Sequence, residues 1–407
     1  MSSITIRKPE GPIRARIVLP RSKSMANRAL VLASLAGQSD VVIDLPTSDD
    51  TRILDVLLRE RALAMHCGLG GTTFRFLTAW AAVQPGEDRL ITGDKKLLER
   101  PHHTLVQALI ALGARIDGLA SGLLVHGTEM KGGELTIDSP VSSQFISAVL
   151  LIAPKMREGL RLQWTDHRLS EPYVRMTIEV LRHFGVRVEA SDEVIQVFPG
   201  PLHAQPITVP MDWSAAAFWF EIVALAKDTR ITLEGLRTGT WQGDERAIEL
   251  WAPWVKAEQT ADGLMLSPQG HPKGTLRTLR MPPIDLTDTP DLFQPLALTL
   301  FGRGEEATIT GLHNLALKES DRLRAVHEAI TACGGTSSIT DAQLELKGRV
   351  DRKPTEPFDP KGDHRMAMAL APLALVNGAI TIQDPDVVHK SYPGFWEDLK
   401  RAGFSVG

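Results

Sequence analysis

The stretch VQALIALGARIDGLASGLLVHG, residues 106–127, holds the pattern that decides the fold. Apolar residues recur at helical spacing up to Leu112, a glycine follows, and two short strand-like runs end in Gly127. The same order returns in IEVLRHFGVRVEASDEVIQVFPG (178–200), AIELWAPWVKAEQTADGLMLSPQG (247–270) and VHEAITACGGTSSITDAQLELKG (326–348). The closing glycines Gly127, Gly200, Gly270 and Gly348 are separated by roughly 70 to 78 residues, and such a period predicts a repeated structural unit.

A second recurring element is a helix that is apolar on nearly every side and opens with a polar residue. Six such segments occur: SMANRALVLASLAG from Ser24, TTFRFLTAWAAVQPG from Thr72, SSQFISAVLLIAP from Ser142, SAAAFWFEIVALA from Ser214, DLFQPLALTLFG from Asp291 and DHRMAMALAPLALVNG from Asp363. A helix that is apolar all round is a buried helix. We therefore expect an α/β protein of six βα-type units, each with one buried helix.

A chain of 407 residues is long enough for two domains. Three units in each would give two similar domains. Pro20 and Pro210 each follow or end a strand-like run and are the expected crossing points between them. We expect one domain over 20–209 and a second over 1–19 plus 210–407.

Composition narrows the class of protein. Lys plus Arg total 45 and Asp plus Glu total 49, so the formal net charge is −4, and no basic excess favours nucleic-acid binding. The two cysteines, Cys67 and Cys333, cannot form a disulfide framework. No apolar run reaches the length of a membrane span. We expect a cytoplasmic protein that binds neither membrane nor nucleic acid.

Polar and cationic residues gather where the apolar helices begin. Helix N-termini expose unpaired N–H groups and carry partial positive charge, so they attract anions. Any one of these residues could be an ordinary cap or surface charge, but their repetition favours an anion site. The residues in question are Lys23, Ser24, Arg28, Gly70, Gly71, Arg75, Arg100, Ser142, Ser143, Gln144, Asp291, Lys318, Arg322, Asp363, His364, Arg365 and Lys390.

Several familiar sites are missing from the sequence. There is no P-loop, no complete dinucleotide-binding glycine pattern and no histidine or cysteine cluster with zinc-ligand spacing. We therefore expect a site without metal or cofactor, built from cations and carboxylates. Cys67 precedes a glycine turn and is expected to be a small buried residue rather than a reactive thiol.

In their order along the chain, these segments resemble the 5-enolpyruvylshikimate-3-phosphate synthase family. The resemblance rests on LPRSKSMANRALVLASLAG, GGTTFRF, ERP, DSPVSSQFISAVLL, SEPYVR, TPDLFQPLAL, LKESDRLRAV, DHRMAMALAPLAL and HKSYPGFWEDL. It covers nearly the whole chain. It implies two similar domains of three βαβαββ units each, an inside-out α/β prism with parallel buried helices and the active site in the cleft between the domains.

The resemblance also implies a reaction. The enolpyruvyl group of phosphoenolpyruvate moves to the 5-hydroxyl of shikimate 3-phosphate through a tetrahedral intermediate, and phosphate leaves. This transferase step belongs to the shikimate pathway of chorismate and aromatic amino-acid biosynthesis, and the family is the target of glyphosate. The resemblance implies small-molecule substrates only, and we expect a monomer.

Site residues follow from the resemblance, position by position. Those matched to shikimate 3-phosphate are Lys23, Ser24, Arg28, Ser142, Ser143, Gln144, Ser170, Tyr173, Asp291, Asn314 and Lys318. Those matched to phosphoenolpyruvate are Lys23, Gly71, Arg100, Gln144, Arg322, Arg365 and Lys390. The matched catalytic residues are Lys23, Asp291, Glu319 and Lys390, with Asp291 expected as the base toward the hydroxyl, and Glu319 with Lys23 expected as methylene proton donors.

The charges fit two multiply charged anions. Seven cations against two carboxylates leave an excess of about five positive charges, close to what two phosphate monoesters with carboxylates need. The chain departs from the family at Arg21, Leu69 and Phe76. We expect Leu69 and Phe76 to reshape the phosphoenolpyruvate side of the pocket.

Two alternatives stay open at this level. The first is an enolpyruvyl transferase acting on UDP-N-acetylglucosamine, a family with a cysteine shortly before the residue matching Arg100, whereas this chain has TGDKKLLERP there. The second is a non-catalytic protein on the same fold that binds a phosphorylated ligand. The presence of both Asp291 and Glu319 argues against it, because carboxylates in an anion site are costly without a proton-transfer task.

Overall fold

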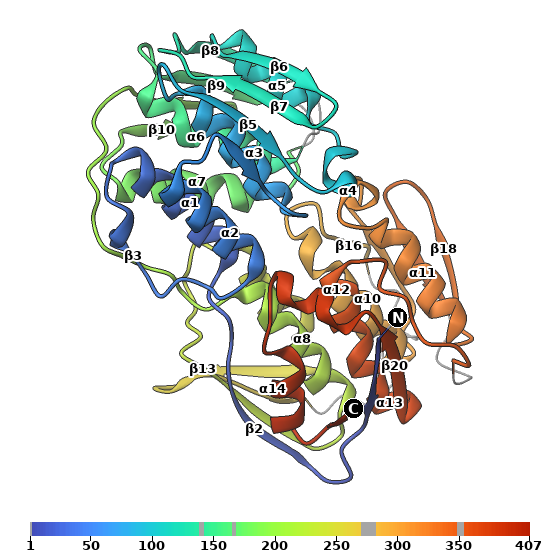
Figure 1. Ribbon diagram of the computed structural model, residues 1–407. Coiled ribbons are helices and arrows are strands. Elements are labelled where there is room, and N and C mark those ends of the chain that lie inside the picture. The colour runs from blue at the N-terminus through green and yellow to red at the C-terminus, as the bar shows by residue number, and fades with distance from the viewer. Residues whose placement is uncertain (1, 138–141, 165–167, 270–281, 348–353) are drawn as a thin grey trace. The chain divides into compact units, whose positions relative to one another are not determined.

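The computed structural model describes residues 2–137, 142–164, 168–269, 282–347 and 354–407. The chain forms two compact units (Figure 1). Residues Arg21–Val209 form one of them, called here the inserted unit. Residues Met1–Pro20 and Pro210–Gly407 form the other, the discontinuous unit. Each unit has a hydrophobic core of its own.

The inserted unit alternates helices and short strands. In chain order its main elements are α1 (Lys23–Leu35), β3 (Val42–Ile43), α2 (Asp49–Glu60), β4 (Ala64–His66), α3 (Gly71–Ala82), β5 (Asp88–Thr92), α4 (Lys95–Leu98), α5 (His103–Ala111), β6 (Arg115–Leu119), β7 (Gly122–His126), β8 (Gly133–Ile137), α6 (Ser143–Ile152), β9 (Leu160–Trp164), α7 (Glu171–His183), β10 (Val188–Ala190), β11 (Val194–Val197) and β12 (Ile207–Thr208).

The discontinuous unit contains both ends of the chain. Its main elements are β1 (Ser3–Arg7), β2 (Ile13–Val18), α8 (Trp213–Leu225), β13 (Thr229–Glu234), η3 (Gly243–Arg246), α9 (Ala247–Trp251), β14 (Val255–Gln259), β15 (Gly263–Pro268), β16 (Ile284–Asp285), η5 (Pro290–Leu292), α10 (Phe293–Arg303), β17 (Ala307–Thr310), η6 (Leu315–Leu317), α11 (Arg322–Ala332), β18 (Thr336–Ile339), β19 (Leu344–Lys347), α12 (His364–Leu370), η7 (Ala371–Leu373), α13 (Ala374–Asn377), β20 (Ala379–Gln383), η8 (Pro385–Lys390), α14 (Phe395–Arg401) and β21 (Ser405–Val406).

The four-stranded sheets show the repeat directly. Their strand orders are β4-β5-β7-β6, β10-β11-β9-β8, β14-β15-β13-β2 and β16-β17-β19-β18. In each sheet the two strands that flank the apolar helix pair in parallel, and the following hairpin adds two antiparallel strands. The pairing is the βαβαββ pattern, so the mixed α/β fold class is confirmed.

The first and sixth units are shorter than the other four. Around α1 the sheet among the described residues is only β3 paired with β12, and around α12 it is β20, β1 and β21. Neither contains the hairpin found in the other units. Of the four closing glycines, Gly127 and Gly200 are described, whereas Gly270 and Gly348 lie outside the described residues.

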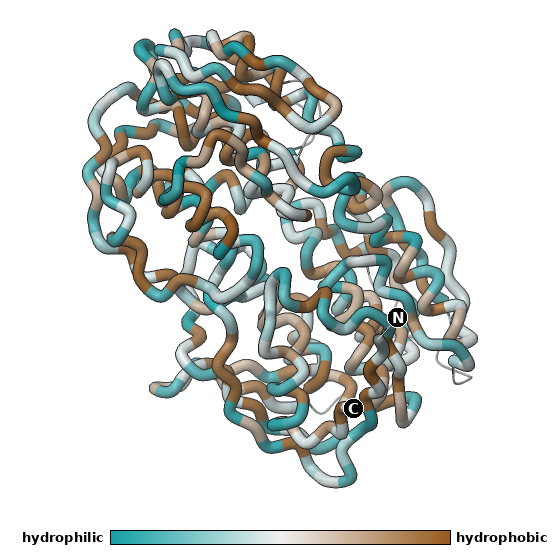
Figure 2. Tube along the Cα trace, in the orientation of Figure 1, coloured by the Kyte–Doolittle hydropathy of each residue, from teal (hydrophilic) through white to brown (hydrophobic). Residues whose placement is uncertain are grey.

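The apolar helices are buried along their length. Every residue of α8, α10 and α12 is buried, and α3 has only Thr72 partly exposed. Hydrophobic residues predominate along α1 (Figure 2). Three of the helices begin earlier than their expected polar residue. The N-caps are Ser22, Gly70 and Asp212, where Ser24, Thr72 and Ser214 were expected, and the Asp212 side chain accepts a hydrogen bond from the Ser214 N–H.

No helix within the described parts of the chain is both long enough and apolar enough to cross a bilayer. Cys67 is fully buried, and burial raises the pKa of its thiol. A buried thiol with a raised pKa is a poor nucleophile, so Cys67 packs as a small apolar residue.

One core helix carries a buried acid. Glu221 lies in α8 and is fully buried, and neither of its carboxylate oxygens has a hydrogen-bond partner among the described residues. Burial raises the pKa of Glu221 well above its usual value. An ionised carboxylate at this place would be expensive, so the folded chain holds Glu221 in its neutral form.

We predict that Glu221→Gln makes stability less dependent on pH. Because the folded pKa is raised, the folded state binds a proton that the unfolded state loses above about pH 4.5, so wild-type stability falls as pH rises through that window. As pH rises above about 5.5, the unfolding free energy of Glu221→Gln relative to the wild type should increase by about 1.4 kcal/mol per pH unit, until the pH reaches the raised pKa of Glu221. Urea unfolding followed by tryptophan fluorescence measures it, with the half-exposed Glu258→Gln as control. A constant gap would refute the buried neutral acid.

Candidate active site

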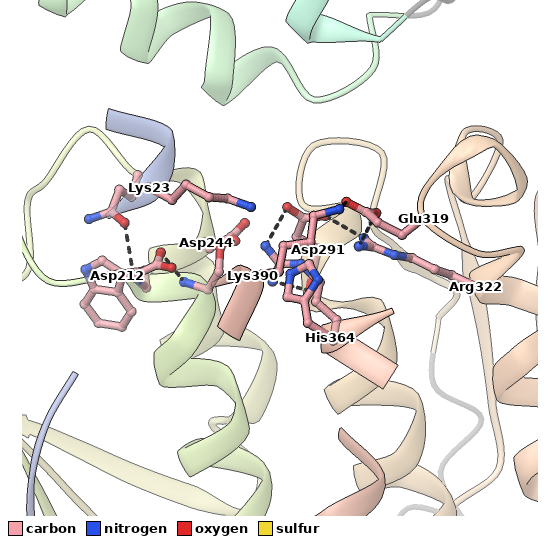
Figure 3. Close-up of polar contacts among 12 residues, drawn as sticks. Lys23, Asp212, Asp244, Asp291, Glu319, Arg322, His364 and Lys390 are labelled. Atoms are coloured by element: carbon pink, nitrogen blue, oxygen red, sulfur yellow. Dashed lines mark hydrogen bonds and ion pairs between the residues drawn. The ribbon is translucent and has the colours of Figure 1, made fainter. Parts of the chain in front are cut away.

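Arg322, the first residue of α11, is the centre of a charged cluster in the discontinuous unit. Its side chain is 2% exposed and meets three carboxylates. Nη1 donates to Asp291 Oδ1 at 2.9 Å, Nη2 to Glu319 Oε2 at 2.9 Å, and Nε to Asp363 Oδ2 at 2.8 Å. The guanidinium therefore uses its planar fork to bring three chain segments together (Figure 3).

Two further cations complete this cluster. Arg365 Nη2 donates to Asp291 Oδ2 at 2.9 Å, so both oxygens of that carboxylate are engaged by arginine. Lys390 Nζ lies 3.1 Å from Glu319 Oε1. Asp363 caps α12 by accepting from the Arg365 N–H at 2.9 Å. Ion pairs through Arg322 thus join the start of α12, the η5 turn before α10 and the end of η8.

The cluster shifts the protonation of its members. Burial alone would raise the pKa of Asp291, but Arg365, Lys318 and Arg322 together hold it far below its usual range. Burial would lower the pKa of Arg322, and Asp363, Glu319 and Asp291 more than reverse this. With both oxygens paired and a depressed pKa, Asp291 is a weak proton acceptor in this state.

Asn314 and Lys318 are the residues immediately before and after η6. Lys318 is partly exposed and acts on Asp291 through its charge. The Oδ1 atom of Asn314 is buried without a hydrogen-bond partner among the described residues. A buried amide oxygen without a donor is costly, and a ligand hydroxyl would satisfy it.

Arg28 is the corresponding buried cation of the inserted unit. It is 2% exposed and donates to Thr177 Oγ1 at 2.7 Å, Ser147 Oγ at 3.0 Å and the Ser24 carbonyl oxygen at 2.7 Å. None of the described residues forms a salt bridge with it. Burial lowers the pKa of Arg28 to about 10, which still leaves it cationic. A buried guanidinium held only by neutral acceptors is suited to an anionic ligand.

The hydrogen bonds of Arg28 also orient the helices. Its position in the second turn of α1 contacts Ser147 and Thr177, which lie in the second turns of α6 and α7. Three helices that meet at the same turn present their N-termini on one side of the inserted unit. This places the starts of α1, α6 and α7 together, as an anion site requires.

Gly71 begins α3, and two arginines approach its backbone. A Cβ atom at this position would lie 2.6 Å from Arg100 Nη1 and 2.9 Å from Arg75 Nη1. Arg75 also donates to the Gln144 side chain on α6 and lies 4.9 Å above the Phe145 ring. Glycine at this point therefore allows two guanidinium groups to gather at one helix N-terminus.

The remaining expected residues lie at the other helix starts of the inserted unit. Lys23 forms a 2.9 Å ion pair with Asp50. Ser142 caps α6 by accepting from the Gln144 N–H, and Ser143 follows it in the first turn. Ser170 caps α7 in a left-handed conformation, with φ 58°. Such a conformation in a non-glycine residue costs about 1 kcal/mol or more and is found mainly at functional sites.

Two aromatic rings lie beside Arg28 in the inserted unit, and one of them was not expected there. The centroid of Tyr173 is 5.9 Å from the Arg28 guanidinium carbon, and that of Phe76 is 5.5 Å from it. We expected Phe76 to bear on the phosphoenolpyruvate residues. The structure places it against Arg28, which the resemblance matches to shikimate 3-phosphate.

The structure brings the expected residues together in two sets, one in each unit. Sequence reasoning did not select Asp50 or Asp244 as functional residues, and it used Arg75 and Asp363 only as helix-start residues. Asp50 and Asp363 each pair with an expected cation, so the positive excess is smaller than about five charges. The only signal for Asp50 was its place at the start of a helical pattern, which is also where ordinary capping residues stand.

No group of three or more His, Cys, Asp or Glu residues in the described part of the chain is arranged to hold a metal ion. The side chains present are guanidinium, ammonium, hydroxyl and carboxylate groups at helix starts. These features define an α/β repeat protein whose helix starts carry cations suited to an anionic ligand together with acid–base groups.

The chain belongs to the EPSP synthase family. The family model described as EPSP synthase (3-phosphoshikimate 1-carboxyvinyltransferase) matches residues 7–61 and 56–399. A 3-phosphoshikimate 1-carboxyvinyltransferase of Bacteroides fragilis is 38% identical over 97% of this chain and 96% of its own length. One of Methanospirillum hungatei is 30% identical over 96% of each. The family expected from the sequence is therefore confirmed.

Solved structures agree on the fold. EPSP synthase from Acinetobacter baumannii superposes with a TM-score of 0.77 at 22% identity, covering 100% of both chains. The enolpyruvyl transferase NikO from Streptomyces tendae gives 0.72 at 16% identity, covering 100% of this chain and 98% of that one. At these identities the likeness shows the fold alone.

We predict that Arg322→Met destabilises the chain. The change leaves the Asp363 carboxylate buried without its cation, and removing one partner of a buried ion pair costs about 3–5 kcal/mol. The exposed Arg324→Met on the same helix is the matched control and should change stability by about 0.5 kcal/mol or less. Urea unfolding at pH 7 measures both, and equal effects would contradict the structural role of Arg322.

Proposed function

We propose that this chain transfers the enolpyruvyl group of phosphoenolpyruvate to the 5-hydroxyl of shikimate 3-phosphate and releases phosphate. The observation that carries the proposal is the Arg322 cluster, in which two carboxylates suited to proton transfer are held by cations suited to binding anions. Family membership supplies the substrate class. Within the proposal the chain acts as a monomer in the cytoplasm, on small molecules only.

Two sets of residues are assigned to the substrates. Arg28, with the hydroxyls of α6 and α7, binds shikimate 3-phosphate, because it is a buried cation without an acidic partner among the described residues. The rest of this set is Lys23, Ser24, Ser142, Ser143, Gln144, Ser170, Tyr173, Asn314 and Lys318. The phosphoenolpyruvate set is Lys23, Gly71, Arg100, Gln144, Arg322, Arg365 and Lys390.

Both halves of the proposed reaction, the addition and the elimination of phosphate, require proton transfer. The methylene carbon of phosphoenolpyruvate gains a proton, the 5-hydroxyl oxygen bonds to the neighbouring carbon, and that hydroxyl loses its proton to a base. In the second half, the carbon–oxygen bond to phosphate breaks and the new methyl group returns a proton. We assign Asp291 to the hydroxyl proton, Glu319 with Lys23 to the methylene proton, and Lys390 to the leaving phosphate.

Anion binding explains how Asp291 becomes a base. Without substrate, Arg322 and Arg365 occupy both of its oxygens and depress its pKa. The same arginines are assigned to phosphoenolpyruvate, whose phosphate and carboxylate compete for the guanidinium groups. Binding would loosen the arginine contacts and raise the proton affinity of Asp291. The base is thereby activated only when the substrate is present.

The two alternatives have less support. The curated relatives carry the name 3-phosphoshikimate 1-carboxyvinyltransferase, which does not favour a UDP-sugar substrate. A binding protein without catalysis would gain nothing from Asp291 and Glu319 in an anion site, because each opposes the ligand's charge.

The activity is tested by phosphate release from shikimate 3-phosphate and phosphoenolpyruvate. We expect Asp291→Asn and Glu319→Gln each to lower kcat by about 10² to 10⁴, the usual contribution of a proton-transfer group. The exposed Glu328→Gln on α11 is the matched control and should retain wild-type turnover. Release with a UDP-sugar alone would favour the rival transferase, and full activity in both variants would remove the catalytic assignment.

Gly71→Ala tests the phosphoenolpyruvate set. The added methyl would displace the Arg100 and Arg75 guanidinium groups, so we expect the KM for phosphoenolpyruvate to rise about tenfold or more, equivalent to 1.4 kcal/mol of lost binding. We also expect glyphosate to compete with phosphoenolpyruvate in the wild type and to bind Gly71→Ala less tightly. Steady-state inhibition at varied phosphoenolpyruvate measures both. No competitive effect at millimolar glyphosate would contradict the second expectation.

A further inference from the structure

Asp244 is a buried carboxylate that the proposed reaction does not use. It lies in η3, immediately before α9, and is 2% exposed. Its Oδ2 atom forms a short hydrogen bond with the Ser214 hydroxyl in the first turn of α8. The turn that contains Asp244 is therefore attached to the N-terminus of a core helix, which is where the expected site residues of this unit also gather.

The charged cluster surrounds Asp244 on several sides. Figure 3 shows it between Asp212 and Asp291. The groups that act on it electrostatically are Asp212 at the cap of α8, Asp291 in η5 and Arg365 on α12, together with the Ser214 hydroxyl. Its own segment also carries Glu245, which accepts from the Gly239 N–H, and Arg246, which donates to the Asp285 carbonyl oxygen.

These neighbours set the charge of Asp244 near neutral pH. Burial and the Asp291 carboxylate raise its pKa, Arg365 and the Ser214 hydroxyl lower it, and the balance is about 7. Asp291 remains ionised across this range because three cations hold it so. Of this carboxylate pair, Asp244 is therefore the member that gains or loses a proton in the physiological range.

We propose that Asp244 is a positioning residue whose ionisation controls the proton affinity of Asp291 through their shared neighbour, Arg365. This rests on the function proposed above. When Asp244 is neutral, Arg365 pairs with Asp291 alone and lowers the proton affinity of Asp291. When Asp244 is ionised, it competes for Arg365 and adds a second negative charge beside Asp291. Both effects make Asp291 a better acceptor of the hydroxyl proton.

The proposal gives a definite pH profile. As pH falls through about 7, the wild-type kcat should drop from its value at high pH toward the lower rate of an enzyme with neutral Asp244. Asp244→Asn is neutral at every pH, so it should lack this limb and turn over at least tenfold more slowly than the wild type at pH 8. Ser214→Ala removes the hydroxyl that favours the ionised form, so its limb should move to higher pH.

Glu249→Gln is the matched control, since Glu249 lies in the adjacent α9 with its side chain 75% exposed. It should keep the wild-type profile. A profile of unchanged shape in Asp244→Asn, whether at full rate or uniformly lowered, would overturn the proposal, because a purely structural role lowers the rate equally at every pH.

A second readout needs no turnover. An acid with a raised folded pKa makes the wild-type Tm fall between about pH 4 and pH 7 relative to Asp244→Asn. If the wild type has no transferase activity, the proposed function fails, and the Tm comparison still decides whether Asp244 titrates as inferred. Parallel Tm curves for the two proteins would overturn the inference by themselves.

Discussion

The six core helices are buried on nearly every side, and this constraint shapes everything else in the chain. A helix that is buried on all sides can present polar groups only at its ends. The N-terminal N–H groups are the stronger of the two for an anion, since the helix dipole adds positive charge there. Within each unit, side-chain contacts join several helix starts: Arg28 joins α1 to α6 and α7, and Arg322 joins α11 to Asp291 before α10 and to Asp363 at the cap of α12.

The helix starts carry charged side chains, and most of the cations there are paired with carboxylates of the same unit. Arg322 is buried with three carboxylates, and Lys23 is paired with Asp50. Arg365 and Lys390 are likewise paired with carboxylates, whereas Arg28 is held by neutral oxygen atoms. In the proposed reaction, substrate anions would replace these carboxylates as partners of the cations, and the released carboxylates would become available for proton transfer.

The sequence pattern predicted the features of the fold that depend on apolar periodicity and on the order of motifs along the chain. Helix-and-hairpin repeats were visible because each repeats the same apolar spacing, and the core helices were visible because they lack a polar face. The first residues of these helices were predicted less accurately, with errors of up to two residues. Ser and Asp stand both at Ser22 and Ser24 and at Asp212 and Ser214, and only backbone geometry decides which residue is the cap.

What the sequence by itself determined is the class of element, the number of repeats and the family, because these depend on local spacing and on the order of motifs. What only the tertiary structure decided is which charges are partners. Asp50 pairs with Lys23, Asp244 accepts a hydrogen bond from Ser214, and Asp363 pairs with Arg322, and none of these contacts can be read from the sequence. The energy of such a pair depends on distance and burial, and neither quantity is contained in a one-dimensional pattern.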